Sequence, residues 1–226
     1  MRRVILSLIA LCTAFFATAE GVKAPKIIAG PYIQACGQNE FTVVWQTDCD
    51  AVSWVEVAPD DGSHFYNKTR EQFFHTIHGR RAVGRWHTVT VTGLEPATTY
   101  RYRVLNKAVV FNPKNGRPYY SEGKGSDVYR RQPYRMRTLS EKAQSLSFAI
   151  GNDFHDKPEL LEQLFSKEII TPKNYDFVLF NGDMVSKLES EERLVQSVIA
   201  PAATQFAAEV PLFISRGNHE TRGAHA

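Results

Sequence analysis

One stretch decides the fold of the C-terminal part of the chain: Phe177-Val178-Leu179-Phe180-Asn181-Gly182-Asp183. Its first four residues form an apolar run of strand length, and its last three are polar residues typical of turns. Two further segments, 146–155 and 211–220, repeat this order of apolar run and polar end. Helical patterns at 158–170 and 188–209 separate the three runs. This alternation predicts parallel strands joined by crossover helices, as at the start of an α/β domain.

Polar side chains able to bind metal follow each predicted strand. They are Asp153 and His155 after the first strand, Asp183 after the second, and Asn218 and His219 after the third. Because parallel strands end at one edge of a sheet, residues far apart in sequence should converge there. Carboxylate, imidazole and amide oxygen form a mixed donor set suited to Mn, Zn or Fe, and one carboxylate can bridge two ions. The sequence therefore predicts a metal site at this edge.

Residues 28–138 have the pattern of an all-β sandwich. Short segments rich in β-branched and aromatic residues are separated by Gly, Asp, Asn and Pro. These segments are 27–34, 41–47, 51–57, 86–92, 99–104 and 134–138. Within 100–104, tyrosine alternates with arginine, which predicts a packed tyrosine face and solvent-exposed arginines.

A corner sequence marks the second half of this β region. Leu94, Pro96, Thr98 and Tyr100 follow the spacing L-x-P-x-T-x-Y. Together with Trp45 in the second predicted strand, this spacing resembles fibronectin type III domains, in which the tyrosine ties down the preceding corner. The resemblance implies a fibronectin type III-like domain over 20–140.

The strand-end motifs resemble the calcineurin-like metallophosphoesterase superfamily, whose pattern is D-x-H, then G-D, then G-N-H-[ED]. The matching residues are Asp153-Phe154-His155, Gly182-Asp183 and Gly217-Asn218-His219-Glu220. A fibronectin-like domain before such a domain is similar to the architecture of purple acid phosphatases. The resemblance implies a multi-domain fold, an all-β fibronectin III-like sandwich followed by the N-terminal part of an α/β metallophosphoesterase domain at 145–226.

The same resemblance implies the roles of the site residues. Asp153 and His155 would bind the first of two divalent or mixed-valence metal ions, Asp183 would bridge both ions, and Asn218 would bind the second. His219 would lie beside the scissile phosphate, stabilising the transition state or protonating the leaving group. A metal-bound hydroxide would attack the phosphorus of a phosphate-ester substrate.

The chain departs from the purple acid phosphatase pattern in two places. Those enzymes carry a tyrosine three residues after the bridging aspartate, where this chain has Ser186. A purple iron(III) site is therefore not expected, and Mn, Zn and Fe stay open. The motif G-H-x-H, which carries further histidine ligands, does not occur, and His225 matches none of the family's motifs. We expect an N-terminal fragment of a longer enzyme that is inactive by itself.

More than one function stays open from the sequence. The first is an exported metal-dependent phosphoesterase, acting on monoesters or on diesters such as nucleotides or nucleic acid. The alternative is a non-catalytic exported fibronectin-like binding module with a degenerate phosphoesterase remnant. With 27 Lys and Arg residues against 24 Asp and Glu, the charge balance gives no reason to expect a nucleic-acid partner other than a substrate.

Residues 1–19 have the pattern of a signal peptide. Arg2 and Arg3 precede an apolar stretch at 4–16, and 17–19 offer a small-x-small cleavage site. We expect cleavage to leave no transmembrane anchor and to deliver the protein to the periplasm or the medium. A buried N-terminal helix or an uncleaved anchor is the alternative interpretation.

Cys36 and Cys49 are expected to be unpaired. The strand predicted between them would hold the two Cα atoms beyond the roughly 7 Å limit for a disulfide.

Four local features complete the expectations. The connection at 105–132 is long, and Asn115-Gly116 within it predicts an extra hairpin. Tyrosines and arginines at 119–137 could bind a polyanion, although a solvated edge beside the next domain is the favoured interpretation. Asp156 is expected to cap the first helix, and Pro201 to kink or divide the second.

Overall fold

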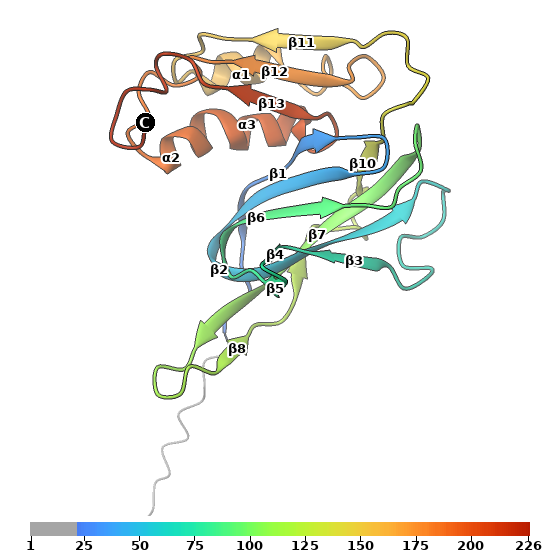
Figure 1. Cartoon of the computed structure of the whole chain (residues 1–226), viewed down its shortest axis with the longest axis vertical. Helices are drawn as coiled ribbons and strands as arrows, with labels where there is room; N and C mark the ends of the chain where they lie inside the picture. Colours follow the sequence, from blue (N-terminus) through green and yellow to red (C-terminus); the bar gives the residue numbers. More distant parts are fainter. Residues whose placement is uncertain (1–21) are drawn as a thin grey trace, which may run out of the picture.

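The computed structural model describes residues 22–226, so the predicted signal peptide lies outside the described residues. Figure 1 shows two parts along the long axis of the molecule: an antiparallel β part and a smaller part in which helices lie beside a parallel sheet. Eight strands of the β part form one connected sheet: β1 Ile27–Cys36, β2 Phe41–Pro59, β3 Glu71–Phe74, β6 Gly84–Val91, β7 Thr99–Phe111, β8 Pro118–Tyr120, β9 Lys124–Gly125 and β10 Tyr134–Arg137. β4 Thr76–Ile77 and β5 Arg80–Arg81 form a separate pair.

The long strand β2 connects the two layers of the β part. The sequence suggested separate strands at 41–47 and 51–57, and this was wrong, because the backbone stays extended through 48–50. The first half of β2 pairs with β1 and β6, and the second half with β3 and β7. Its pairing with β6 shifts register between Gln46 and Ala51. Such an irregularity lets one strand change partners without a loop, so both layers close on one core.

That core contains the predicted tyrosine face. Tyr102 is fully buried, and its ring lies 5.6 Å from that of Phe41 between centroids. The tyrosine corner is confirmed, because the hydroxyl of Tyr100 accepts a hydrogen bond from the Glu95 backbone N–H at 2.9 Å. The corner therefore joins the loop before β7 to the strand itself.

The expectation that the arginines of β7 meet water was wrong for Arg101. This side chain is buried, and its guanidinium donates to the carbonyl oxygen of Pro59 at 2.8 Å and to Asp61 at 3.0 Å. Pro59 is the last residue of β2, and Asp61 belongs to the loop that follows it, so the end of β2 and this loop together cover Arg101. A period-two pattern predicts which residues share a face, but it does not predict what covers that face.

The hairpin predicted at Asn115-Gly116 is confirmed. Val109 of β7 pairs with Tyr120 of β8, and Gly116 occupies the left-handed region at φ 66°. Cys36 and Cys49 carry free thiols.

The C-terminal part contains a three-stranded parallel sheet, as predicted. The strands lie in the order β11 Phe148–Gly151, β12 Phe177–Asn181 and β13 Leu212–Ser215. Val178, Phe180 and Leu212 are fully buried against the helices. All three strands run in the same direction, so their C-terminal ends share one edge, and the chemistry-bearing motifs follow at that edge.

The helices differ from their predicted bounds. The helix α1 spans Pro158–Leu164 and is shorter than the predicted 158–170. The second helical segment runs through α2 Glu191–Leu194, the π-helical turn η1 Val195–Ile199, α3 Ala200–Ala202 and the π-helical turn η2 Ala203–Ala207. Pro201 does not divide it, because the wider turns on either side accommodate a residue without an N–H. Within residues 22–226, no helix combines the length and apolar character that a membrane-crossing segment needs.

The two parts share a hydrophobic core. Ala29, Tyr32 and Val44 of the β part belong to the same buried cluster as the helices and the parallel sheet. Tyr102 donates its hydroxyl proton to the Ala208 carbonyl oxygen at 2.6 Å. Buried apolar contacts and a buried hydrogen bond therefore set the position of the α/β part on the β part.

Candidate metal centre

The loops at the strand ends have an unusual backbone. Asp153, His155, Asp156 and Asp183 all have positive φ, between 48° and 60°. Residues other than glycine rarely adopt this backbone region. Holding one there costs on the order of 1–3 kcal/mol of folding free energy unless the surroundings stabilise it. Strained residues of this kind cluster at functional sites. The strain therefore marks the same loops that the motifs indicated.

Two glycines allow these loops to meet. A Cβ on Gly182 would lie 2.6 Å from the Gly217 backbone, and a Cβ on Gly217 would lie 2.3 Å from Asp183 Oδ1. Neither contact is sterically possible. The loop after β12 and the loop after β13 can therefore lie in backbone contact only because both residues lack a side chain.

A group of three candidate metal ligands results. One ligand atom from each of His155, Asp183 and His219 lies within 4.8 Å of the other two. The imidazole rings of His155 and His219 lie 4.4 Å apart between centroids, in an edge-to-face arrangement. Asp183 Oδ1 also accepts the backbone N–H of His219 at 2.8 Å, which orients the carboxylate. Carboxylate and imidazole donors at this spacing suit Mn, Zn or Fe.

The tautomer of His219 follows from its neighbour. His219 Nδ1 lies 2.8 Å from the carbonyl oxygen of Ser186. Because a carbonyl oxygen only accepts, Nδ1 carries the proton, and Nε2 is left with a free lone pair. Metal-binding histidines are commonly oriented by such a backbone bond. His219 is therefore prepared to bind a metal or a proton at Nε2.

Asp153 lies at the margin of the group. Its Oδ1 is 3.5 Å from His155 Nε2, and its side chain is 57% exposed. The sequence predicted that Asp153 and His155 bind the same ion. The structure places them 3.5 Å apart, but Asp153 is not one of the three grouped ligands His155, Asp183 and His219.

Asn218 lies beside Asp183, and the orientation of its amide is informative. In one orientation its oxygen is 2.9 Å from Asp183 Oδ2, so that two acceptors face each other. In the reverse orientation the amide donates to Asp183 and accepts from Arg222 at 2.8 Å. Two facing acceptors repel each other, so the reverse orientation is the one that satisfies both neighbours. Asn218 therefore lies beside Asp183 as its donor, and the amide oxygen that would bind metal faces Arg222. Carboxylate, imidazole and amide together still form a donor set that fits Mn, Zn or Fe.

Glu220 is a structural residue that the sequence analysis did not single out. Its buried carboxylate accepts from the backbone N–H groups of Asp183, Met184, Val185 and Gly217, at 2.7–3.2 Å. Burial by itself raises the pKa of Glu220, but these four donors outweigh it, and the pKa is lowered. The motif G-N-H-E contained Glu220, although nothing in its pattern showed that it joins two loops.

Asp156 does not cap the first helix, so that expectation was wrong. Lys157 occupies the cap position without a side-chain bond. Asp156 instead accepts two bonds from Arg193, at 2.8 and 2.7 Å, and one from the Ser186 N–H at 2.9 Å. The bond from Arg193, and then that from Ser186, lowers the pKa of Asp156 to about 2. No sequence signal linked these residues, because Arg193 belongs to a distant helix.

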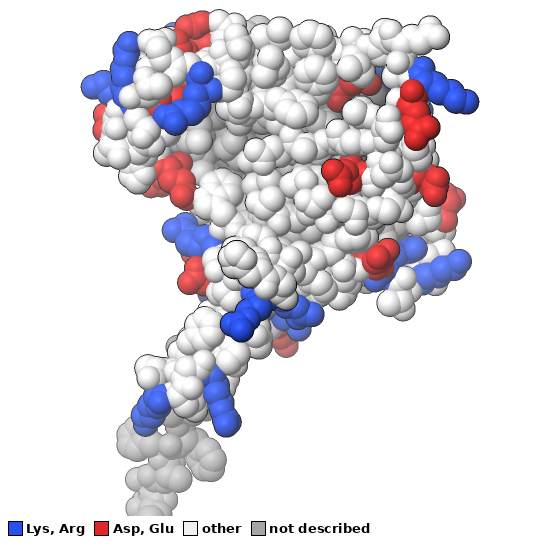
Figure 2. Space-filling view, in the orientation of Figure 1, with Lys and Arg blue, Asp and Glu red and all other residues white. Residues whose placement is uncertain are grey.

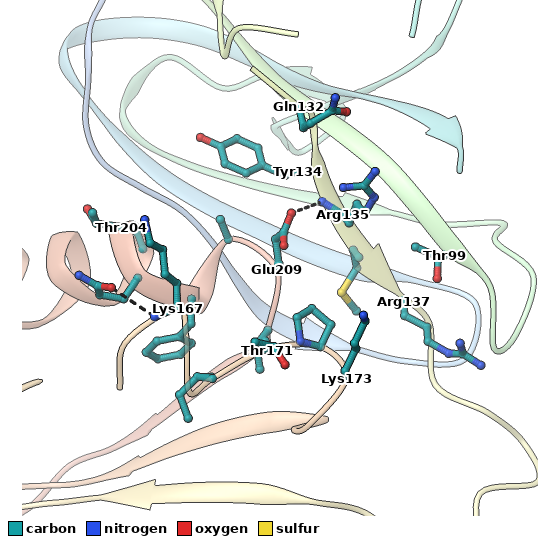
Figure 3. A pocket seen from close by; sticks show the side chains of 18 residues that line it. Thr99, Gln132, Tyr134, Arg135, Arg137, Lys167, Thr171, Lys173, Thr204 and Glu209 are labelled. Carbon is teal, nitrogen blue, oxygen red and sulfur yellow. Dashed lines mark hydrogen bonds between the residues drawn. The ribbon is translucent and has the colours of Figure 1, made fainter. Parts of the chain in front are cut away.

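A cleft of about 960 Å³ lies between β10 and the α/β part, away from this centre. Figure 3 shows Arg135, Arg137, Lys167 and Lys173 around it, with Glu209 accepting from the Arg135 backbone N–H at 3.0 Å. Its lining on the α/β part comes from segments that precede β12 and β13, so it opens at the sheet edge opposite the strand-end motifs. The arginines of β10 thus border the neighbouring domain, as the favoured interpretation expected.

Comparisons with known proteins agree with the two-part architecture. The family profile described as "Purple acid Phosphatase, N-terminal domain" matches residues 31–122, and the profile "Calcineurin-like phosphoesterase" matches residues 146–226. A search of curated proteins finds no match.

Among solved structures, the purple acid phosphatase PPD1 from yellow lupin (Lupinus luteus) seeds is similar, with a TM-score of 0.56 at 18% identity. The match covers 89% of this chain and 36% of the lupin chain, so this chain spans little more than a third of that protein. The long and short forms of the sensor domain of the anti-sigma factor RsgI4 from Pseudobacteroides cellulosolvens give TM-scores of 0.27, at 13% and 10% identity. They cover 54% and 53% of this chain and 97% and 98% of their own.

The matched profiles and the shared fold confirm the resemblance that the motifs indicated, while the domain limits 20–140 and 145–226 stay predictions. This chain therefore combines a purple acid phosphatase N-terminal domain with part of a calcineurin-like phosphoesterase domain.

Proposed function

We propose that this chain forms part of an exported phosphoesterase that uses two metal ions to hydrolyse a phosphate ester. The observation that supports this function is the grouping of His155, Asp183 and His219 at the strand ends of a calcineurin-like phosphoesterase domain. Residues 1–19 support export, since they have the pattern of a cleavable signal peptide.

The proposal assigns one ion to Asp153 and His155 and the other to Asn218, with Asp183 between them. Such ions supply Lewis acidity towards a phosphate oxygen and a nucleophile near neutral pH. The two carboxylate oxygens of Asp183 have different neighbours: Oδ1 accepts the His219 N–H, and Oδ2 faces Asn218. This arrangement suits a carboxylate that lies between two ions.

His219 can donate a proton to the leaving group without moving its ring. Its Nδ1–H stays bonded to the Ser186 carbonyl oxygen, so Nε2 can gain or lose a proton without movement of the ring. A protonated Nε2 would donate to the leaving oxygen, and a neutral Nε2 would bind metal. The proposal covers monoesters and diesters, because both are hydrolysed through the same metal chemistry.

Metal binding tests the site, with Asp183→Asn as the variant and Asp50→Asn, an exposed aspartate of the β part, as its matched control. Equilibrium dialysis against Mn²⁺ and Zn²⁺ should show at least a roughly tenfold loss of affinity for Asp183→Asn and none for Asp50→Asn. Equal affinity for all three proteins would contradict the assignment.

Hydrolysis tests the activity. The 226 residues lack G-H-x-H, and we expect no turnover of an aryl phosphate monoester or diester by them alone. If the coding frame continues into G-H-x-H, the extended product should hydrolyse one of the two esters and lose this activity with Asp183→Asn. An extended product that binds metal but hydrolyses neither ester would favour the alternative of an exported binding module.

A further inference from the structure

The hairpin of β7 and β8 projects from the β part and carries exposed apolar side chains. Figure 1 shows it at the end of the molecule opposite the α/β part. Val110, Phe111, Tyr119 and Tyr120 are each 50–53% exposed. Because successive residues of a strand alternate between faces, these side chains occupy both faces of the hairpin. Apolar groups gathered in this way mark an interaction surface rather than a packed core.

The charged residues of the hairpin are all basic. Lys107, Lys114 and Arg117 lie in 107–121, and this segment has no Asp or Glu. Figure 2 shows Lys and Arg on the projecting end and no acidic group there. Aromatic side chains with polar edges settle at the boundary between lipid headgroups and acyl chains, and basic side chains are attracted to anionic headgroups. The hairpin combines both properties.

The N-terminal segment leads to the same end of the molecule. Residues 22–24 line a shallow hollow at the base of the hairpin together with Val109 and Val110, and Asp48 and Asp50 line it as well. The described chain therefore begins beside the base of this hairpin.

We propose that the hairpin at 109–120 docks on an anionic phospholipid surface. Phe111, Tyr119 and Tyr120 enter the headgroup region, while Lys114 and Arg117 contact lipid phosphates. Because the α/β part lies at the opposite end of the molecule, the strand-end metal centre stays exposed to solution when the hairpin is docked.

Amide hydrogen exchange of the full chain can locate the contact with lipid. It measures protection of each segment separately, so binding by residues 1–21 is distinguished from binding by the hairpin. Vesicles of phosphatidylglycerol and phosphatidylcholine are compared with vesicles of phosphatidylcholine alone. We expect added protection at 109–120 with the anionic vesicles only.

A charge reversal tests the basis of the contact. Lys114→Glu with Arg117→Glu should raise the lipid concentration for half-maximal protection by about thirtyfold or more, from the loss of two basic contacts. These substitutions keep the turn, because residues 114 and 117 bond to Asn112 and Asn115 through backbone N–H groups. Lys167→Glu with Lys173→Glu makes the same charge change on exposed residues of the α/β part and should leave the midpoint unchanged.

Three results would overturn the proposal. The first is no added protection at 109–120 with anionic vesicles, and the second is equal protection with phosphatidylcholine alone. The third is protection that rises with protein concentration in the absence of vesicles, which would assign the hairpin to self-association.

Discussion

Acid should destabilise the β part through one buried histidine. His87 is fully buried, and its Nε2 lies 2.8 Å from Thr47 Oγ1. Thr47 donates its hydroxyl proton to the Cys49 carbonyl oxygen at 2.8 Å, so it must accept from His87 Nε2–H. His87 Nδ1 is then an acceptor without a hydrogen-bond partner among residues 22–226. Burial, with a smaller effect of His75, lowers the pKa of His87 from 6.5 to about 3.

The direction of the effect follows from proton binding. Below pH 6.5 the unfolded chain protonates His87, while the folded chain does not until the pH approaches 3. The unfolded state then binds more protons, so stability falls as the pH falls. At about pH 5 the loss is roughly 2 kcal/mol, from 1.36 kcal/mol for each pH unit below the unfolded pKa. Burial also lowers the pKa of His75, which adds a loss of the same sign.

The three tryptophans provide the assay. Trp45, Trp54 and Trp86 all lie in the β part, so their fluorescence during urea unfolding follows this part, including the core that Trp86 shares with the α/β part. His87→Gln keeps a donor for Thr47 but cannot titrate, and His64→Gln changes an exposed histidine as the control. Between about pH 7.5 and pH 5, the parent and the control should each lose roughly 2 kcal/mol more unfolding free energy than His87→Gln. An identical loss in all three proteins would refute the reasoning.

Three further substitutions test local contacts. Tyr100→Phe removes the acceptor of the Glu95 N–H and should lower the unfolding free energy of the β part by ~1 kcal/mol, seen as a lower urea midpoint; an unchanged midpoint would contradict the tyrosine corner. Gly182→Ala places a Cβ 2.6 Å from Gly217, so metal affinity in equilibrium dialysis should fall. Gly62→Ala, also at positive φ but with open space around it, controls for backbone strain, and equal effects would argue against the close approach. Glu220→Gln removes the charge that holds four N–H groups and should destabilise the strand-end loops by ~2 kcal/mol, whereas exposed Glu189→Gln should not. Limited proteolysis beyond residue 145 measures this difference, and equal cleavage of both variants would contradict the role of Glu220.

Local pattern was sufficient to predict the parallel strands and the convergence of the motifs at their ends. The apolar runs at 146–150, 177–180 and 211–215 predicted parallel strands, and parallel strands place their C-terminal ends together whatever covers them. For that reason Asp153, His155, Asp183, Asn218 and His219 could be named before their distances were seen. Asn115-Gly116 predicted its hairpin for a similar reason, because the turn depends on backbone preferences of neighbouring residues.

Contacts between distant segments decided the buried polar interactions and the pairing of the long strand β2. The burial of Arg101 depends on a loop that folds over β7, and the bond from Arg193 to Asp156 depends on how a helix packs beside the first strand-end loop. Glu220 satisfies donors more than thirty residues away, and the single strand β2 depends on which partners each half finds. The sequence by itself determined most strands and turns and which motifs follow the parallel strands, because those choices are local. Only the tertiary structure decided which polar groups satisfy one another, because burial and hydrogen bonding are properties of segments brought together by folding.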